Sequence, residues 1–484
     1  MKRSFLLNLA FLIFLNLLVK PFYIFGIDRV VQNRVGAEEY GLYIALFNFT
    51  FLFQIINDFG IHQFNNRNIS QNRHLLEKYF PNILWLKIIL AGIYTLTILS
   101  IGLMTGYTIN HFEILALFII NQILISLTFY LRSNLSALGF YKTDSFLSIV
   151  DRLLLIMIVG YMLWFWKGSE RFQIEYFVYA QTFTLATTFL IAFTLAARQL
   201  KYWRFNFKRS FSLLILKQTW PYALAIFLMT IYTYTDVVMI ERMLTDGKYQ
   251  AGAYGAGYRL LDAVNMLGYL FTMLLLPMLS KLIIKNVKEA ASLTYFGFQL
   301  LMAVAIPISI SSFFYREEIM TLLYQEATPY WAELMGILIL TFMAMSCTYV
   351  FITLLTANDS LRSMNRLLIF GFILNFGLNL FMIPKYKAWG AAVSTFICQF
   401  GMAIGLMILA HRKVQINFRS GVWLKIFLFT LICIGINLFF ENFFRFDWKW
   451  VYFLGIFASL LFAAMMKLLN FNVLFDLIKN KEGN

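Results

Sequence analysis

The chain has 484 residues, of which 61 % are hydrophobic and only 13 % are charged. Soluble globular proteins average about 45–50 % apolar and about 25 % charged residues, so this composition excludes an ordinary soluble domain and indicates an integral membrane protein. The formal net charge of +16 does not indicate nucleic-acid binding, because the basic residues are dispersed between apolar runs and form no basic domain or arm.

The first predicted element is the apolar run near residues 5–25. It resembles a signal peptide but lacks a small-residue cleavage site and leads straight into another apolar run, so we predict a spanning helix. A search for runs of about 20 residues predicts an all-α integral membrane protein with fourteen transmembrane helices. The runs lie near 5–25, 41–60, 82–103, 113–138, 146–166, 174–196, 218–239, 251–277, 293–314, 331–356, 365–383, 388–410, 423–440 and 448–466.

The loops between these runs differ in charge. Loops on the side of the N-terminus are rich in Lys and Arg, whereas the opposite loops hold more acidic than basic residues. Cytoplasmic loops of membrane proteins carry the excess of basic residues, which predicts that both termini are cytoplasmic. The densest basic cluster lies between the sixth and seventh spans, where we predict a cytoplasmic linker that could also contact anionic lipid headgroups.

A short sequence pattern occurs twice, 211 positions apart. Residues 35–43 read VGAEEYGLY and residues 247–254 read GKYQAGAY, and both share the order Gly, four residues, Gly, one residue, Tyr. The matched pairs are Gly36 with Gly247, Gly41 with Gly252, and Tyr43 with Tyr254. We interpret the glycines as a tight entry into a helix and the tyrosines as interfacial residues.

This offset maps the first six spans onto the next six with the same orientation. We therefore predict two six-helix lobes related by pseudo-two-fold symmetry about an axis along the membrane normal, followed by two C-terminal helices. The predicted parts are an N-terminal lobe (1–200), a basic cytoplasmic linker (201–217), a C-terminal lobe (218–412), and two extra helices with a cytoplasmic tail (413–484).

Four segments resemble a known family. They are RVGAEEYGLYIALFNFTFLFQIINDFGI in the second span, WPYALAIFLMTIYTYTDVVMI in the seventh, AGAYGAGYRLLDAVNM in the eighth, and IPKYKAWGAAVSTF across the eleventh and twelfth. In order and spacing they are similar to the polysaccharide-transporter family of oligosaccharide flippases, within the multidrug/oligosaccharidyl-lipid/polysaccharide exporter superfamily. The family motifs would carry over to Gly36, Gly41, Tyr43, Asp58, Gly60, Pro221, Asp236, Gly252, Tyr254 and Arg259.

The resemblance implies a two-lobed transporter in the bacterial cytoplasmic membrane. Its substrate would be an undecaprenyl-diphosphate-linked oligosaccharide, moved from the inner to the outer leaflet for surface polysaccharide synthesis. Implied partners are membrane lipids and the polymerase and glycosyltransferases of the same pathway, with no nucleic acid.

Ionisable residues inside the predicted spans form the candidate substrate site, since a charge at the bilayer centre costs at least about 2.5–3.5 kcal/mol. They fall into two tiers of depth. The inner tier consists of Asp58, Lys87, Arg132, Asp151 and Arg152, and the outer tier consists of Lys20, Asp236, Arg259 and Asp262.

Several of these residues also have purely structural explanations. Arg132 and Asp151 lie at similar predicted depth on consecutive spans and could form an ion pair. Lys20 could extend its amine to the outer interface. Lys87 and Arg152 have no obvious partner in the sequence, which makes them the preferred candidates for binding an anionic ligand.

The outer-tier residues of the seventh and eighth spans leave similar alternatives. Arg259 and Asp262 are three residues apart on one helix face and could neutralise each other. Asp236 ends the polar run TYTYTD and could line a cavity or form an interhelical hydrogen bond.

The sequence contains no catalytic or nucleotide-binding signature. The four histidines are predicted to be scattered through loop regions without metal-ligand spacing, and no Gly-x-x-x-x-Gly-Lys-Ser/Thr motif is present. We therefore predict a transporter without a cofactor or metal, not an enzyme. A multidrug exporter of the same superfamily is the main alternative, and a membrane glycan polymerase or ligase is a further one.

Overall fold

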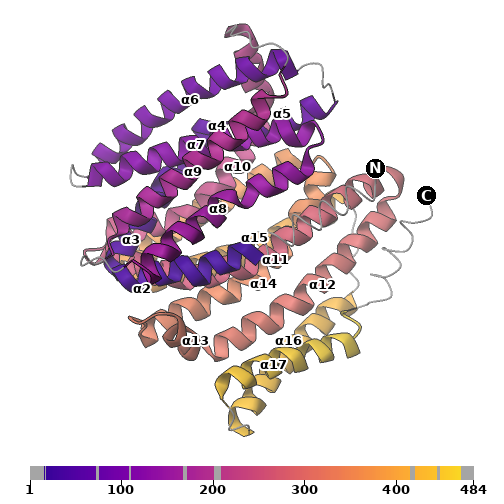
Figure 1. Ribbon diagram of the computed structural model, residues 1–484. Helices are drawn as coiled ribbons and strands as arrows, with labels where there is room; N and C mark the ends of the chain where they lie inside the picture. Colours follow the sequence, from indigo (N-terminus) through magenta and orange to yellow (C-terminus); the bar gives the residue numbers. More distant parts are fainter. Residues whose placement is uncertain are drawn as a thin grey trace. The chain divides into compact units, whose positions relative to one another are not determined.

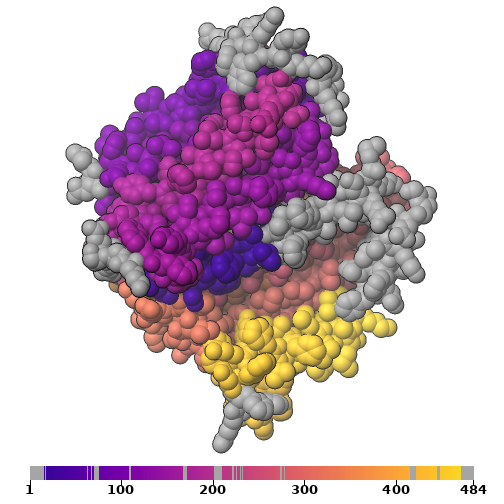
Figure 2. Space-filling view, viewed as in Figure 1, coloured from indigo at the N-terminus to yellow at the C-terminus, as the bar shows by residue number. Residues whose placement is uncertain are grey.

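The computed structural model describes residues 16, 18–71, 76–107, 111–166, 172–200, 209–414, 420–443 and 447–469. The other residues are grey in Figures 1 and 2. All regular structure in the described ranges is helical. The elements are η1 (Tyr23–Asp28), α2 (Arg29–Val35), α3 (Ala37–Leu52), α4 (Gln54–Asp58), α5 (Ile61–Gln71), α6 (Leu76–Met104), α7 (Phe112–Ala137), α8 (Tyr141–Trp164), α9 (Ile174–Ala197), α10 (Arg209–Met243), α11 (Gly247–Lys285), α12 (Val287–Phe314), α13 (Arg316–Leu323), α14 (Pro329–Ala357), α15 (Leu361–Val414), α16 (Ser420–Phe443) and α17 (Trp448–Met465).

Nine of the described helices are long and apolar enough to cross a membrane, namely α6, α7, α8, α9, α12, α14, α15, α16 and α17. One of them, α15, is interrupted by non-helical backbone at Lys387 (φ 56°, ψ −142°), which separates the two predicted spans 365–383 and 388–410. The prediction of an all-α, multi-pass membrane protein is therefore confirmed.

The chain forms two compact units, residues 1–255 and 256–484. Each unit has more contacts within itself than with the other. The predicted lobe boundaries and the pseudo-two-fold relation between the lobes stay predictions. Of the predicted linker, residues 201–208 lie outside the described residues, while 209–217 belong to the first turns of α10.

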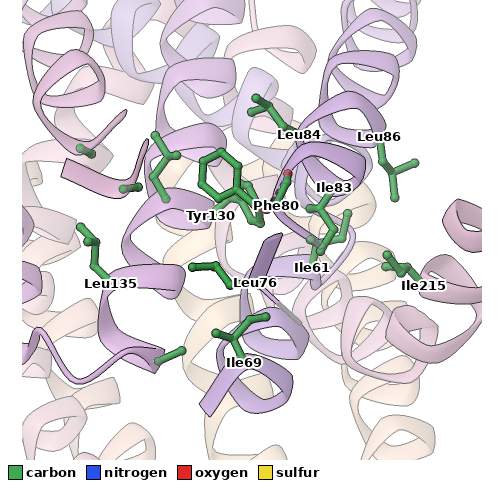
Figure 3. Packing of buried hydrophobic residues seen from close by; sticks show 14 of the residues in the cluster. Ile61, Ile69, Leu76, Phe80, Ile83, Leu84, Leu86, Tyr130, Leu135 and Ile215 are labelled. Carbon is green, nitrogen blue, oxygen red and sulfur yellow. Dashed lines mark hydrogen bonds between the residues drawn. The ribbon is translucent and has the colours of Figure 1, made fainter. Parts of the chain in front are cut away.

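A buried apolar cluster holds helices of the first unit together. Its members come from α5, α6, α7, α8, α9 and α10, and Figure 3 shows Phe80 of α6 beside Tyr130 of α7, with Ile69 of α5 near Leu76 of α6. The Tyr130 hydroxyl is also satisfied, because it donates to the carbonyl oxygen of Phe80 at 3.0 Å. This packing supports the polar residues that lie between the same helices.

In the second unit, the two C-terminal helices α16 and α17 pack against α12 and against each other. A hydrogen bond of 3.0 Å between the hydroxyls of Ser312 and Tyr452 joins α12 to α17. Large apolar side chains remain exposed on both helices, among them Phe427 and Phe453. Figure 2 shows these helices in yellow at the surface. Such exposure suits helices that face lipid.

The first span extends further than the sequence predicted. Helical backbone continues from residue 18 through η1, a π-helical segment, and α2 to Val35. The helix ends at Gly36, whose φ of 90° is a conformation that favours glycine. The predicted end near residue 25 was wrong, because the charged residues Asp28 and Arg29 lie within the helical backbone, where Asp28 accepts a hydrogen bond from the Tyr40 hydroxyl.

The second span is not one continuous helix. It consists of α3 and α4, separated at Phe53, and is followed by α5 after a second break at Phe59 and Gly60. Both residues of the second break have positive φ, 51° and 70°. A left-handed residue other than glycine costs roughly 1–2 kcal/mol, so the surrounding structure must hold this break in place.

Candidate functional site

Hydrogen bonds in both directions join the interrupted second span to α7. The amides of Gln54 and Asn57 both donate to the carbonyl oxygen of Gln122 on α7, at 3.1 and 3.0 Å. In return, the Ser126 hydroxyl of α7 donates to the carbonyl oxygen of Asn57 at 3.1 Å. A broken helix in a membrane needs such partners, and broken helices are common at transporter binding sites.

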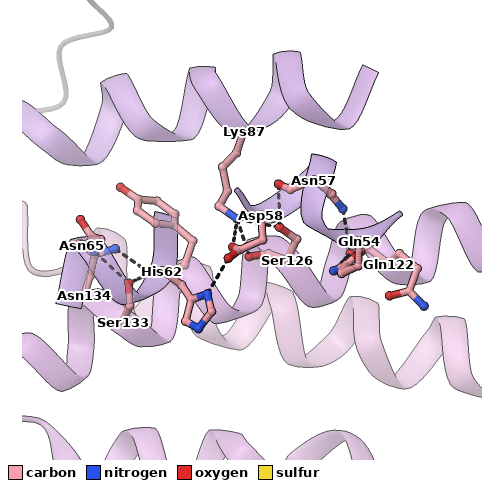
Figure 4. Close-up of polar contacts among 11 residues, drawn as sticks. Gln54, Asn57, Asp58, His62, Asn65, Lys87, Gln122, Ser126, Ser133 and Asn134 are labelled. Atoms are coloured by element: carbon pink, nitrogen blue, oxygen red, sulfur yellow. Dashed lines mark hydrogen bonds and ion pairs between the residues drawn. The ribbon is translucent and has the colours of Figure 1, made fainter. Parts of the chain in front are cut away.

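Asp58, at the end of α4, pairs with Lys87 of α6. The Lys87 ammonium lies 2.6 Å from Asp58 Oδ1, and the Lys87 side chain is 0 % exposed (Figure 4). The ammonium also donates to the hydroxyl and carbonyl oxygens of Ser126, at 2.6 and 3.2 Å. All three of its protons therefore have acceptors. The prediction that Lys87 lacks a partner was wrong, because the break brings Asp58 within reach of α6.

His62, at the start of α5, completes this group. Its Nδ1 lies 2.6 Å from Oδ2 of Asp58, so the carboxylate joins a lysine and a histidine across the break. The prediction that the histidines lie in loops was wrong for His62 in α5 and for His411 in the last turn of α15. The sequence did contain an indication of this pair, because Asp58 and His62 are four residues apart in the segment NDFGIH. This segment lies at the predicted end of the second span. Among the described residues, no group of three or more His, Cys, Asp and Glu is placed to hold a metal ion.

Three cations of the first unit, Lys20, Arg132 and Arg152, lie close enough together to interact electrostatically; we call them the cation group. Asp151 also interacts with Lys20 and Arg152. Among the described residues Lys20 forms no ion pair, and its side chain is half-buried. The outer-tier position predicted for Lys20 was wrong. Because the first helix continues to Gly36, Lys20 lies about 24 Å from that end at 1.5 Å per residue.

Arg132 pairs with a different acid from the one predicted. Its Nε lies 2.7 Å from Oδ1 of Asp144, so the predicted pair with Asp151 was wrong. The error came from the start of the fifth span, which is Tyr141 and not residue 146. Asp151 lies seven residues after Asp144 on α8, which puts it about 10 Å deeper along the helix axis.

Arg152 is the more accessible of the two arginines in the cation group. Its side chain is 37 % exposed, and its Nε lies 3.6 Å from Asp151 Oδ2, so the prediction that Arg152 lacks a partner was also wrong. Its guanidinium lies over the ring of Tyr23, 4.6 Å from the ring centroid. Tyr23 is the first residue of the π-helical segment η1, and such segments are frequent at functional sites. Asp28, at the other end of η1, also interacts with Arg152.

The remaining predicted site residues are Asp236, Arg259 and Asp262. Asp236 is 2 % exposed and accepts a hydrogen bond from the Tyr254 hydroxyl at 3.0 Å, which corresponds to the interhelical alternative. In the second unit, Arg259 and Asp262 form the expected pair on one helix face, with 3.7 Å between Nη1 and Oδ2. Asp262 keeps a 39 % exposed side chain.

The repeated glycines form a direct helix contact. A Cβ atom at Gly41 of α3 would collide with the carbonyl oxygen of Lys248 of α11, and one at Gly252 would collide with that of Ala37. Their absent side chains allow the two helices to meet backbone to backbone. The repeated tyrosines are buried, Tyr43 at 4 % and Tyr254 at 0 % exposure, so both pack inside the protein, and their interfacial depth stays a prediction.

Comparisons with known proteins agree with this architecture. The model of the polysaccharide biosynthesis protein family matches residues 6–283, and the MatE family model matches residues 221–381. No curated protein matches the chain.

Solved structures show the same fold. A structure of the lipid II flippase MurJ in an inward closed conformation aligns with a TM-score of 0.70 at 14 % identity, covering 96 % of this chain and 99 % of that one. An inward-facing multidrug resistance MATE family transporter of the MOP superfamily aligns with a TM-score of 0.64 at 14 % identity, covering 81 % and 94 %. A MOP superfamily transporter from Pyrococcus furiosus aligns with a TM-score of 0.60 at 12 % identity, covering 84 % and 95 %.

Proposed function

Since this chain belongs to the polysaccharide biosynthesis protein family and has the fold of MOP-superfamily transporters, we propose that it is a flippase for lipid-linked oligosaccharides. Its substrate is a polyprenyl-diphosphate-linked oligosaccharide, which it moves from the inner to the outer leaflet of the bacterial cytoplasmic membrane. Both termini lie in the cytoplasm, and the cycle is alternating access. The transported product serves the polymerase and glycosyltransferases of surface polysaccharide synthesis.

The observation that carries this proposal is the cation group. Lys20, Arg132 and Arg152 come from three different helical segments and lie together inside a membrane-spanning unit. Intramembrane cations are costly and mark substrate pathways. Two phosphate groups joined to an apolar chain and a polar glycan are a ligand that needs such a site.

The contacts of these cations favour different roles. Arg152 is half exposed and only loosely held by Asp151, so it can offer its planar fork to a phosphate. Lys20 supplies a point charge beside it. Arg132 is committed to Asp144 at 2.7 Å and acts mainly by holding α7 against α8.

The other candidates support this reaction indirectly. Lys87 and Asp58 neutralise each other at the break in the second span. Arg259, Asp262 and Asp236 remain proposed contacts for a later stage of the cycle.

Complementation of surface-glycan export tests the proposal. We expect Arg152→Gln to abolish export at unchanged membrane abundance, and Arg152→Lys to retain part of it because the charge remains. Lys20→Gln should reduce export similarly. Lys142→Gln is the matched control, since Lys142 is an exposed cation on the same helix α8. Normal export by a Lys20→Gln, Arg152→Gln double variant would refute the role of the cation group.

A multidrug exporter is the second candidate, because the MatE family model matches residues 221–381. The two functions separate in reconstituted vesicles. A flippase moves undecaprenyl-diphosphate-linked disaccharide to the opposite leaflet, whereas an exporter moves a soluble cationic dye such as ethidium and leaves the lipid in place. Elongation of the glycan by the purified protein would instead indicate a polymerase or ligase.

A further inference from the structure

Aromatic rings and amides lie beside one another where the second span meets α7. We propose that Phe47, Phe51, Gln54 and Gln122 form a sugar subsite, which contacts the neutral sugar rings of the transported lipid. It is distinct from the cation group, which we assign to the phosphates. This inference rests on the proposed function, because it assigns residues to a second part of the same substrate.

Two phenylalanine rings of α3 stack one helical turn apart. The ring centroids of Phe47 and Phe51 are 5.8 Å apart, and the ring planes are inclined by 25°. The Tyr234 ring of α10 lies 4.7 Å from the Phe51 ring, and the Phe118 ring of α7 lies 6.0 Å from the Phe47 ring. Phe118 is buried, whereas the other three side chains are only half-buried and keep accessible surface. Aromatic faces are partly negative, so they attract the weakly positive C–H groups of a sugar ring.

The rings of the sugar subsite do not belong to a lipid-facing helix. Helix α3 packs against α2, α7, α9 and α10, and none of its large apolar side chains, all of which are described, is exposed. By contrast, α6 exposes Ile89 and Leu96. Phe47 lies about 15 Å along the helix axis from Ala37, which is half of a hydrocarbon core of about 30 Å. The rings are therefore inside the protein near the bilayer midplane, where transporters commonly bind their substrates.

The amides of the sugar subsite have polar atoms without partners. Gln122 is 0 % exposed, and neither its Oε1 nor its Nε2 has a hydrogen-bond partner among the described residues. The Oε1 of Gln54 is buried in the same way, while its Nε2 donates to the carbonyl oxygen of Gln122 at 3.1 Å (Figure 4). A buried polar group without a partner costs about 1–3 kcal/mol. These amide atoms therefore need a partner that the described part of the chain does not supply.

Sugar hydroxyls match these atoms chemically. A hydroxyl group both donates and accepts hydrogen bonds, and an amide side chain offers an acceptor oxygen and two donor hydrogens. Ordered water normally satisfies buried amides, and a ligand hydroxyl replaces such water without loss when it makes the same hydrogen bonds. An amide carries no charge, so it does not compete with the cation group for phosphate. Gln54 is half-buried and is the accessible edge of the amide pair.

A row of rings connects the sugar subsite to the cation group. Arg152 interacts electrostatically with Tyr43 of α3, which precedes Phe47 by about one helical turn. The Tyr43 ring also lies 5.5 Å from the Phe118 ring. The row Tyr43, Phe47 and Phe51 extends about 12 Å along α3. A glycan whose diphosphate is bound by Arg152 is therefore placed beside this row.

Two lipids that differ only in their sugars test the sugar subsite. The measurement is the binding of undecaprenyl-diphosphate-linked disaccharide and of undecaprenyl diphosphate to the full-length protein in detergent micelles. Phe51→Leu should weaken binding of the disaccharide lipid about two- to tenfold, the range of one aromatic contact, and leave binding of undecaprenyl diphosphate unchanged. Gln122→Leu should have the same selective effect without a loss of stability, because it removes buried polar atoms that lack a partner. Arg152→Gln should weaken the binding of both lipids.

Phe49→Leu is the matched control, since Phe49 lies on the same helix but is 3 % exposed and packs against the rings of Phe53 and Tyr107. It should change the binding of neither lipid, and Phe51→Tyr, which keeps the ring face, should bind both normally. Equal losses for the two lipids in Phe51→Leu would overturn the sugar subsite and leave the proposed function standing. Normal binding of the disaccharide lipid by a Phe51→Leu, Gln122→Leu double variant would do the same. A wild type that binds neither lipid would overturn both.

Discussion

The ion pair between Asp58 and Lys87 allows a quantitative test of the broken second span. Asp58→Asn leaves the Lys87 ammonium, which is 0 % exposed, with only the neutral oxygens of Ser126. Removing one partner of a buried ion pair costs about 3–5 kcal/mol, because the other charge stays buried alone. Lys87→Met should cost less, about 1–3 kcal/mol, since Asp58 keeps His62 and an 11 % exposed side chain.

The double variant Asp58→Asn, Lys87→Met contains neither charge. Replacing both members of a buried pair is often neutral, so we expect its stability to exceed that of Asp58→Asn, with a coupling energy of at least about 2 kcal/mol. Unfolding followed by tryptophan fluorescence in mixed micelles gives the free energies, and membrane abundance gives an independent readout. Arg152→Gln is the comparison, and because Arg152 is 37 % exposed its cost should stay below about 1 kcal/mol. A double variant no more stable than Asp58→Asn would refute the pairing.

Three further predictions follow from other parts of the chain. Gly41→Ala should lower the stability of the protein by about 2 kcal/mol or more, and with it the membrane abundance, because the added Cβ would collide with backbone. Gly92→Ala is the control and should be tolerated, because the space around Gly92 is open. Equal abundance of the two variants would contradict the helix contact. A cysteine that replaces the exposed residue Gln199 should react with an impermeant maleimide only from the cytoplasmic side. A cysteine that replaces the exposed residue Gln325 should react only from the outside. Labelling of both cysteines from the same side would disprove the predicted topology. Burial, with two nearby cations, lowers the pKa of His111 below its ordinary value of 6.5. The unfolded state therefore binds a proton at His111 more readily than the folded state, so the free energy of unfolding falls as the pH drops through about 6.5. The melting temperature of His111→Gln should fall less between pH 7.5 and 5.5 than that of the wild type. The same fall in both proteins would contradict this assignment to His111.

The membrane class and most of the helices could be predicted from the sequence alone. Hydropathy is a local, additive property of a run of residues, so segments such as α7, α9 and α14 were predicted to within a few residues. The family resemblance was equally local, because it rests on short motifs in a fixed order. The pairing of Arg259 with Asp262 also needed only helical periodicity, since the two lie on the same helix.

Only the tertiary structure decided which charges meet. Whether Lys87 contacts Asp58, and whether Arg132 contacts Asp144 or Asp151, depends on the depth and rotation of neighbouring helices. An error of five residues in the start of α8 changes depth by about 7 Å and reverses the choice of partner. The break after Asp58 and the continuation of the first helix to Val35 likewise involve contacts that hydropathy does not register, namely the hydrogen bond from the Ser126 hydroxyl to the carbonyl oxygen of Asn57 and that from the Tyr40 hydroxyl to Asp28. The type of charge is therefore determined by the sequence, whereas its exact depth, its partner and its accessibility arise from packing.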